Sequence, residues 1–218
     1  MKSKLEVPSG ESTVLLHTCC APCSSAIIEC LLDNGVTPVI YYCNPNIYPA
    51  EEYLIRKEEC SRYAEALGLE IVDADYDHDA WLEAMAGFEE EPERGGRCLR
   101  CFGLRLYRTA CYARERGIKV ITTTLASSRW KSLEQIDRAG RWACAKANSL
   151  MQDLQACSVA DRDAGQDAAQ DISTDVIWWD RNWRKGGLQE RRLQIINEYG
   201  FYNQQYCGCE FSMRKDLL

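Results

Sequence analysis

Three cysteines stand close together near the start of the chain, in HTCCAPCSS at residues 17–25. Cys19 and Cys20 are adjacent, and Cys23 follows just past Pro22. Thiolates are ligands for soft metals and are also the reactive species in thiol–disulfide exchange. Crowding of this kind favours metal binding or redox chemistry over a role in core packing.

A second group, RCLRC, places Cys98 and Cys101 one helical turn apart, so that both sulfurs can reach one metal centre. With Cys19 and Cys20 they supply the four thiolates of a [4Fe–4S] cluster. Four thiolates also suit tetrahedral zinc, and a C-x-x-C pair can be a redox dithiol. Adjacent cysteines are less usual for structural zinc, which favours an iron–sulfur cluster.

A third group, YCGC, has only Gly208 between Cys207 and Cys209. A disulfide across C-x-C closes a very small ring and is strained, so it is easily reduced and suits a redox relay. Two free thiols on a mobile tail are the alternative.

The 13 cysteines do not predict a disulfide framework. No apolar run approaches the ~20 residues of a membrane span, and no apolar stretch precedes Pro8 that could act as a signal peptide. We therefore expect a cytoplasmic protein, in a compartment that keeps thiols reduced. An odd number of cysteines also fits full pairing badly.

The net charge of −7 does not suggest a nucleic-acid binder. Arginines nevertheless recur from Arg94 to Arg114 with no acidic residue between them. A local basic face on an acidic protein can contact phosphates, because fields are short-ranged at physiological salt. A solvated helix face is the alternative.

Strand-length apolar runs alternate with helical patterns along the chain. Strands are expected at 13–18, 37–44, 69–76, 119–125 and 175–180, and helices at 26–34, 51–67, 79–87, 99–117, 133–148 and 187–200. Ser24 or Ser25 is a candidate cap for the first helix. This alternation predicts a parallel sheet with helices on both faces, and a polar surface insertion at 149–173.

The first cysteine group then lies between the first strand and the first helix. Open α/β sheets bind ligands at this carboxyl edge. Cys23 is placed just ahead of a helix N-terminus, whose free N–H groups and dipole favour thiolate over thiol.

Four motifs resemble the QueH-type epoxyqueuosine reductases: LLHTCCAPCS, CLRCFGLRL, VITTTLASS with WKSLEQI, and FYNQQYCGCEFS. They occur in that family's order and cover nearly the whole chain apart from 149–173. The resemblance implies a bacterial oxidoreductase that completes queuosine synthesis on tRNA. Such an enzyme removes the epoxide oxygen of epoxyqueuosine and leaves a cyclopentene. The implied partners are tRNA and an external electron donor, with neither membrane nor DNA.

The resemblance also implies a fold and site residues. The fold is a single Rossmann-like (HUP-like) α/β domain over 1–218, with a mostly parallel sheet and a C-terminal extension over the site. The family's [4Fe–4S] ligands match Cys19, Cys20, Cys98 and Cys101. Its redox-active disulfide matches Cys207 and Cys209, and Cys23 stands where a ligand of a second, mononuclear iron is expected, although some relatives place Asp there. The loop ASSRWK lacks an expected proline, and the 149–173 insertion is longer than usual.

Two rival functions remain. An ATP-dependent tRNA-modifying enzyme of the thiolation type shares the expected architecture, but it needs a Gly-rich phosphate loop where this chain reads CCAPCSS. A non-catalytic zinc-binding module is the second rival.

The reaction also needs a proton donor and an RNA contact. His17, Tyr202 and Tyr206 are candidate proton donors. The stretch WWDRNWRKGG at 178–187 combines tryptophans for base stacking with Arg184 and Lys185 as candidate phosphate contacts. Core packing of those tryptophans is the alternative, because the first two fall in an expected strand.

Overall fold

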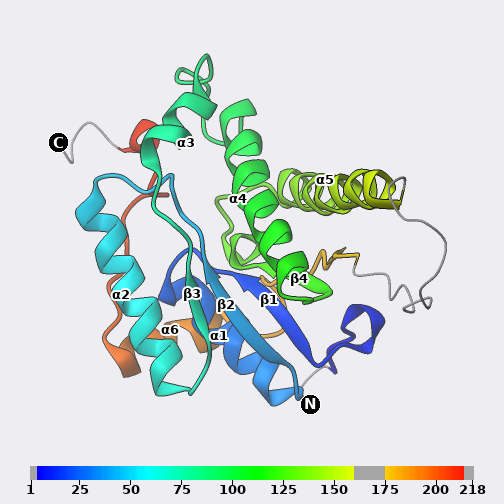
Figure 1. Cartoon of the computed structure of the whole chain (residues 1–218). Helices are drawn as coiled ribbons and strands as arrows, with labels where there is room; N and C mark the ends of the chain where they lie inside the picture. Colours follow the sequence, from blue (N-terminus) through cyan, green and yellow to red (C-terminus); the bar gives the residue numbers. More distant parts are fainter. Residues whose placement is uncertain (1–3, 160–174, 214–218) are drawn as a thin grey trace.

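A five-stranded parallel sheet forms the centre of the computed structural model, which describes residues 4–159 and 175–213. Its strands are β1 (Thr13–His17), β2 (Thr37–Tyr42), β3 (Ile71–Asp73), β4 (Val120–Thr123) and β5 (Ile177–Trp178). Their order is β3-β2-β1-β4-β5, and every pairing is parallel (Figure 1). The chain therefore has the expected single Rossmann-like α/β architecture.

Helices cover both faces of this sheet (Figure 1). They are α1 (Ala21–Asp33), α2 (Ala50–Ala66), α3 (His78–Met85), α4 (Gly96–Glu115), α5 (Leu133–Val159) and α6 (Leu188–Tyr199). Helices α1, α2 and α6 share one hydrophobic core, while α4 and α5 share another on the opposite face. None of the described helices is long and apolar enough to cross a membrane.

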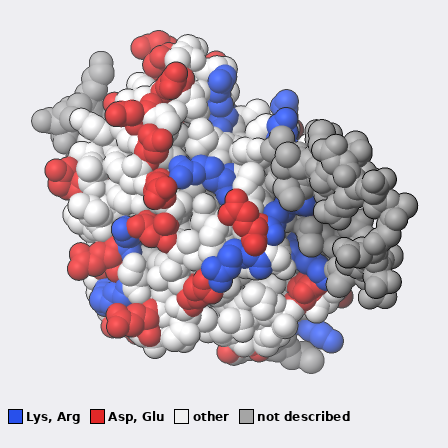
Figure 2. Space-filling model, viewed as in Figure 1, with Lys and Arg blue, Asp and Glu red and all other residues white. Residues whose placement is uncertain are grey.

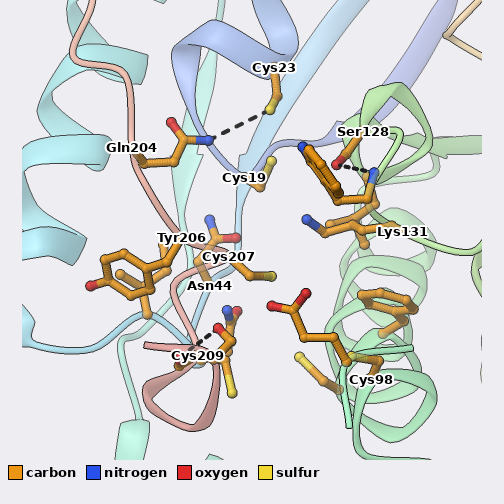
Figure 3. Close-up of a pocket in the computed structure, with 18 of the residues that line it drawn as sticks. Cys19, Cys23, Asn44, Cys98, Ser128, Lys131, Gln204, Tyr206, Cys207 and Cys209 are labelled. Atoms are coloured by element: carbon orange, nitrogen blue, oxygen red, sulfur yellow. Dashed lines mark hydrogen bonds between the residues drawn. The ribbon is translucent and has the colours of Figure 1, made fainter. Parts of the chain in front are cut away.

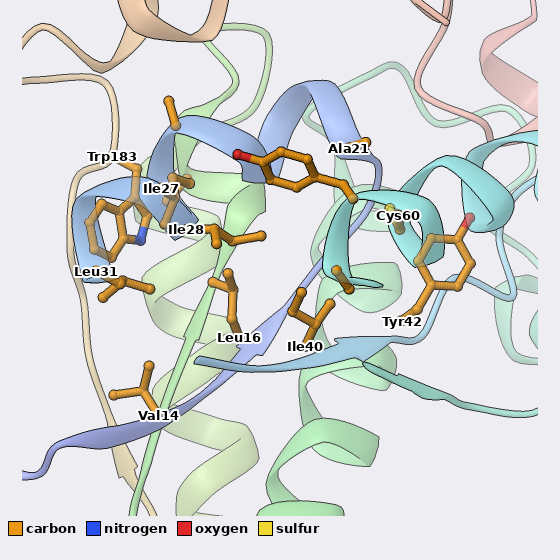
Figure 4. Close-up of a cluster of buried hydrophobic side chains, with 14 of the residues drawn as sticks. Val14, Leu16, Ala21, Ile27, Ile28, Leu31, Ile40, Tyr42, Cys60 and Trp183 are labelled. Carbon is orange, nitrogen blue, oxygen red and sulfur yellow. The ribbon is translucent and has the colours of Figure 1, made fainter. Parts of the chain in front are cut away.

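Strand β1 supplies side chains to both cores. Val14 and Leu16 pack with α1 and α2 (Figure 4), whereas Leu15 packs on the other face with α4. All three are fully buried. A strand that is covered on both faces has a continuous run of apolar residues, and this run is why the sequence TVLLHT predicts a strand. Burying each such side chain contributes about 1.5–3 kcal/mol.

The start of α1 differs from the prediction. The helix begins at Ala21 with Cys20 as its N-cap, so Ser24 and Ser25 lie inside it and neither caps it. Proline in the first turn presets a helical φ and lacks only an N–H that would have no partner there. Pro22 occupies this place and explains the earlier start. Cys23 is consequently within the first turn of α1, not ahead of it.

The C-terminal segment folds back over the carboxyl edge of the sheet, as predicted (Figure 1). The backbone N–H of Tyr48 donates to the Gly208 carbonyl at 2.8 Å, and the buried Arg56 donates to the Tyr206 and Cys207 carbonyls, both at 3.3 Å. Gly208 has φ of +110°, and a Cβ there would lie 2.9 Å from Ile47. Glycine is therefore required at the centre of YCGC.

Helix α5 is longer than the sequence predicts, since its backbone continues to Val159. The first part of the expected 149–173 insertion is thus helical, and 160–173 lie outside the described residues. Gly140, in the middle of α5, makes room for β5. A Cβ at this position would lie 2.2 Å from the Trp178 indole ring.

This contact predicts opposite effects for two glycine substitutions. Gly140→Ala should lower the free energy of unfolding by about 1–2 kcal/mol, because overpacking outweighs the gain in helix propensity. Gly103→Ala in α4 should raise it by about 0.5–1 kcal/mol, because its Cβ meets only Trp142, at an ordinary 3.6 Å. Urea unfolding followed by circular dichroism measures both. Equal stability of the two variants would contradict this account of Gly140.

Candidate functional site

Cysteines from three distant segments line one cavity at the carboxyl edge of the sheet (Figure 3). The cavity has a volume of about 720 Å³. We call it the cysteine cavity. The turn after β1 contributes Cys19 and the start of α1 contributes Cys23. Helix α4 contributes Cys98 and Cys101, and the C-terminal segment contributes Cys207 and Cys209.

The thiol trio, Cys19, Cys20 and Cys23, is the most compact group. Their sulfur atoms all lie within 4.8 Å of one another, and the Sγ atoms of Cys19 and Cys20 are 3.9 Å apart. A tetrahedral ion with metal–sulfur bonds of about 2.3 Å separates its thiolates by about 3.8 Å. The trio therefore has the spacing of ligands to one metal ion.

Within the trio, Cys19 is the favoured thiolate. Hydrogen bonds from Cys20 and Cys23 hold the pKa of the Cys19 thiol well below its usual range, and Lys131 adds to this effect. Burial raises the pKa of Cys20, and the hydrogen bond to Cys19 raises the pKa of Cys23 to about 11. Thr124 fixes Cys19 from the end of β4, since its hydroxyl accepts from the Cys19 N–H at 3.2 Å.

The α4 pair lies elsewhere on the cavity wall. Cys98 accepts a hydrogen bond from the Arg94 N–H at 3.3 Å, while Cys101 is 7% exposed and packs with Trp81 and Cys209. Burial raises the pKa of both thiols. Among residues 4–159 and 175–213, no group of ligand atoms within 4.8 Å joins this pair to the trio. Cys207 and Cys209 form no disulfide in the described structure.

Cations surround the thiols. Arg105 is 2% exposed, and it donates to the Cys43 carbonyl at 3.2 Å and to the side chain of Asn44. Burial lowers the pKa of Arg105, but Cys101, Cys19 and Cys207 more than offset this and raise it. Lys131 points into the cavity (Figure 3), and its pKa is raised by the same kind of contact despite burial.

Neither Arg105 nor Lys131 forms an ion pair with a carboxylate in the described part of the chain. A buried charge without a partner is strongly unfavourable. Cavity thiolates would balance both charges and raise both pKa values, and Glu93 is the one carboxylate among the residues that line the cavity. A thiol cluster beside the buried Arg105 and the half-buried Lys131 fits a thiolate-ligated metal centre.

His17 lies beneath the cavity and does not line it. Its Nε2–H donates to the Cys43 carbonyl at 3.1 Å, and its Nδ1 accepts from the Thr123 hydroxyl at 2.7 Å. Burial, aided by Arg105, lowers its pKa to about 3. The lowered pKa favours the neutral ring, and both ring nitrogens are occupied by hydrogen bonds. Of the candidate proton donors, only Tyr206 lines the cavity, and its hydroxyl donates to the Tyr48 carbonyl.

Two carboxamides from separate segments also face the cysteine cavity. Gln204 donates from Nε2 to the Cys20 sulfur at 3.0 Å, so the C-terminal segment covers the trio (Figure 3). Gln204 Oε1 and Asn46 Oδ1 are buried and have no hydrogen-bond partner in the described structure. Buried acceptors are normally satisfied. A ligand that brings hydroxyl or amine donors would satisfy both.

A short loop at the cavity mouth, residues 128–131, was not identified as functional from sequence. We call it the rim loop. Arg94 donates to the carbonyls of Trp130 (2.8 Å) and Arg129 (3.0 Å). Arg184 donates to the carbonyls of Lys131 (2.6 Å) and Ser128. The motif WKSLEQI includes Trp130 and Lys131. The contacts from the two arginines span 35 to 56 residues of sequence, however, and leave no local signal.

The candidate RNA contacts at 178–187 differ in their exposure to solvent. Trp179 and Trp183 are 6% and 0% exposed, so they belong to the core and cannot stack on bases. Trp178 packs over Gly140. The Arg184 guanidinium is used to hold the rim loop, while Lys185 is exposed.

Comparison with known proteins gives a consistent result. A family described as epoxyqueuosine reductase QueH matches residues 14–161 and 149–215. The chain is 42% identical over 214 residues to an epoxyqueuosine reductase QueH of Histophilus somni, covering 98% of this chain and 77% of the relative. It is 43% identical over 211 residues to that of Acinetobacter baylyi, covering 97% and 85%. A more distant relative from Thermotoga maritima is 30% identical over 204 residues, covering 92% and 90%.

The contacts of the rim loop predict different outcomes for two neighbouring cations. Arg184→Ala should lower the free energy of unfolding by about 1–2 kcal/mol, because the loop carbonyls lose a charged donor. Hydrogen exchange in 128–131 should accelerate. Lys185→Ala is the matched control and should change neither quantity. Mass-spectrometric hydrogen exchange with urea unfolding measures both, and unaltered exchange in Arg184→Ala would show that the arginine does not hold this loop.

Proposed function

The chain belongs to the epoxyqueuosine reductase QueH family and is an oxidoreductase of queuosine biosynthesis, and on this premise we propose that the cysteine cavity is its reaction site. The substrate is epoxyqueuosine in tRNA, and the product is queuosine. The observation that carries the proposal is the convergence of three cysteine-bearing segments on one cavity lined with buried cations. We assign the [4Fe–4S] ligands to Cys19, Cys20, Cys98 and Cys101.

The net reaction breaks both C–O bonds of the epoxide, forms a C=C bond and releases water. It consumes two electrons and two protons. The bound cluster would supply electrons singly, and a second iron beside it would act as a Lewis acid toward the epoxide oxygen. We propose Cys23 as a ligand of that second iron. The Cys23 sulfur lies within 4.8 Å of those of Cys19 and Cys20, so an iron held by Cys23 would lie beside a cluster held by the other two.

The protein's own residues prepare the cavity for this chemistry. Arg105 and Lys131 balance the negative charge of the thiolates and keep it buried. The free carboxamide oxygens of Asn46 and Gln204 accept hydrogen bonds from the polar substituents of the substrate ring. Gln204 and the C-terminal segment restrict water access to the trio, which strengthens electrostatic interactions inside.

Cys207 and Cys209 are assigned to electron supply. Oxidation of the two thiols to a disulfide releases two electrons and two protons, which matches the demand of one turnover. An external dithiol then restores both thiols by exchange. Cys207 lines the cavity beside the α4 pair, while Cys209 packs against Trp81. The pair thus lies next to the proposed ligands Cys98 and Cys101.

The ligand assignment predicts a loss of cofactor on substitution. Cys98→Ala should abolish most of the iron content and of the absorbance near 400 nm after anaerobic purification, together with conversion of epoxyqueuosine in tRNA. Cys111→Ala, on the same helix but outside the cavity, is the control and should retain all three. A full iron complement in Cys98→Ala would remove this residue from the ligand set.

The relay assignment predicts a dependence on the reductant. Cys207→Ser and Cys209→Ser should keep the iron content yet lose multiple turnover with a dithiol donor. A strong chemical reductant that bypasses the thiols should restore part of the activity. Steady-state assays with each reductant make the comparison, again with a Cys111→Ser control. Equal loss with both reductants would point to a structural or direct catalytic role.

A further inference from the structure

Trp130 is the most exposed of the large apolar side chains in the described structure, at 71%. It nevertheless lines the mouth of the cysteine cavity. A lone exposed apolar residue needs no explanation in itself. Trp130 differs from such a residue because it lies beside the proposed reaction site and is carried by a loop that two arginines hold in place.

The rim loop that carries Trp130 is held from two sides. Arg94 and Arg184 donate to all four of its carbonyls, as described above. Arg94 also adopts φ of 66°, a left-handed conformation that is uncommon outside glycine and concentrates at functional sites. An aromatic face presented on a fixed loop loses little conformational entropy when it binds.

A basic groove continues from the cavity mouth past this loop. Its cationic lining residues are Arg94, Arg129, Lys131, Arg138 and Arg184, and Glu134 is its only acidic one. Arg129 and Arg138 are exposed. Elsewhere the charges are mixed: the face in Figure 2 intersperses both signs, with acidic side chains gathered at the top of the view. The groove therefore has a positive local potential, although the protein as a whole is acidic.

We propose that Trp130 is a stacking platform for a nucleotide that neighbours the target base in the anticodon loop, with Arg129 and Arg138 contacting the adjacent phosphates. The proposal rests on the proposed function. If the target base enters the cavity, its neighbours on the same strand must lie at the rim. Unpaired bases stack on aromatic faces, and flanking cations bind the backbone. Arg129 lies 5.9 Å from the Trp130 ring and contributes to the same surface.

The chain offers a matched control in Trp142. It is 52% exposed but lies on α5 against Gly103 and Tyr107, and it does not line the cavity. The probe is the unmodified anticodon stem-loop RNA, titrated into anaerobically purified, iron-loaded protein. Binding of this RNA requires no turnover, so affinity is measured independently of the reaction.

Trp130→Ala should raise the Kd for this RNA by about five- to 150-fold, the range of one base stack. Trp130→Phe should recover most of the affinity, and Trp142→Ala should leave it unchanged. The slope of log Kd against log salt should stay the same in Trp130→Ala but fall by about one unit in Arg138→Ala.

Wild-type affinity in Trp130→Ala, or an equal loss in Trp142→Ala, would overturn the proposal. Failure of the Trp130 proposal can be distinguished from failure of the proposed function. If wild-type protein converts epoxyqueuosine in tRNA while Trp130→Ala binds RNA normally, the function stands and the platform is wrong. If wild-type protein does not convert it, the function fails, and a Trp130-dependent Kd would still establish an RNA surface.

Discussion

Strand β1 is hydrogen-bonded on both sides, to β2 and to β4, and the geometry of the site depends on this pairing. The chain winds outward from β1 to β3 and then resumes at β4 on the other side. Such a reversal opens a crevice beyond the carboxyl ends of the two central strands. Cys19 leaves β1 at that point, and its N–H is bonded to Thr124 at the end of β4. The sheet therefore fixes the thiol trio before any metal binds.

Helix α4 and the rim loop bring positive charge to the thiols in this crevice. Arg105 from α4 and Lys131 from the rim loop bring positive charge to the thiols without a carboxylate partner in the described residues. Thiolates crowded together repel one another, and cations buried alone are unfavourable. Each set therefore stabilises the other. A metal centre bound by the thiolates would keep them deprotonated, and the cations would limit the net charge that results.

The sequence predicts the order of the elements well, because buried parallel strands and amphipathic helices leave local patterns. TVLLHT and CCAPC locate the site at the carboxyl edge of β1. Contacts between distant segments leave no such pattern. Ser24 or Ser25 was the candidate helix cap, yet α1 begins earlier, at Ala21, with Pro22 in its first turn. Trp183 looked available for RNA but is fully buried, whereas Trp130, which was noted only as part of a family motif, is exposed. Burial of a tryptophan depends on which elements pack over it, and only the folded chain decides that.

The central claim is that the cysteine cavity holds iron bound by thiolates from the β1 turn and from α4. Anomalous X-ray scattering at the iron and zinc absorption edges, from crystals of anaerobically purified protein, tests it most directly. The account predicts iron peaks in the cavity, with sulfur ligands from Cys19 and Cys20 on one side and from Cys98 and Cys101 on the other. A single zinc peak at Cys19, Cys20 and Cys23, with no iron and with free thiols on α4, would contradict it.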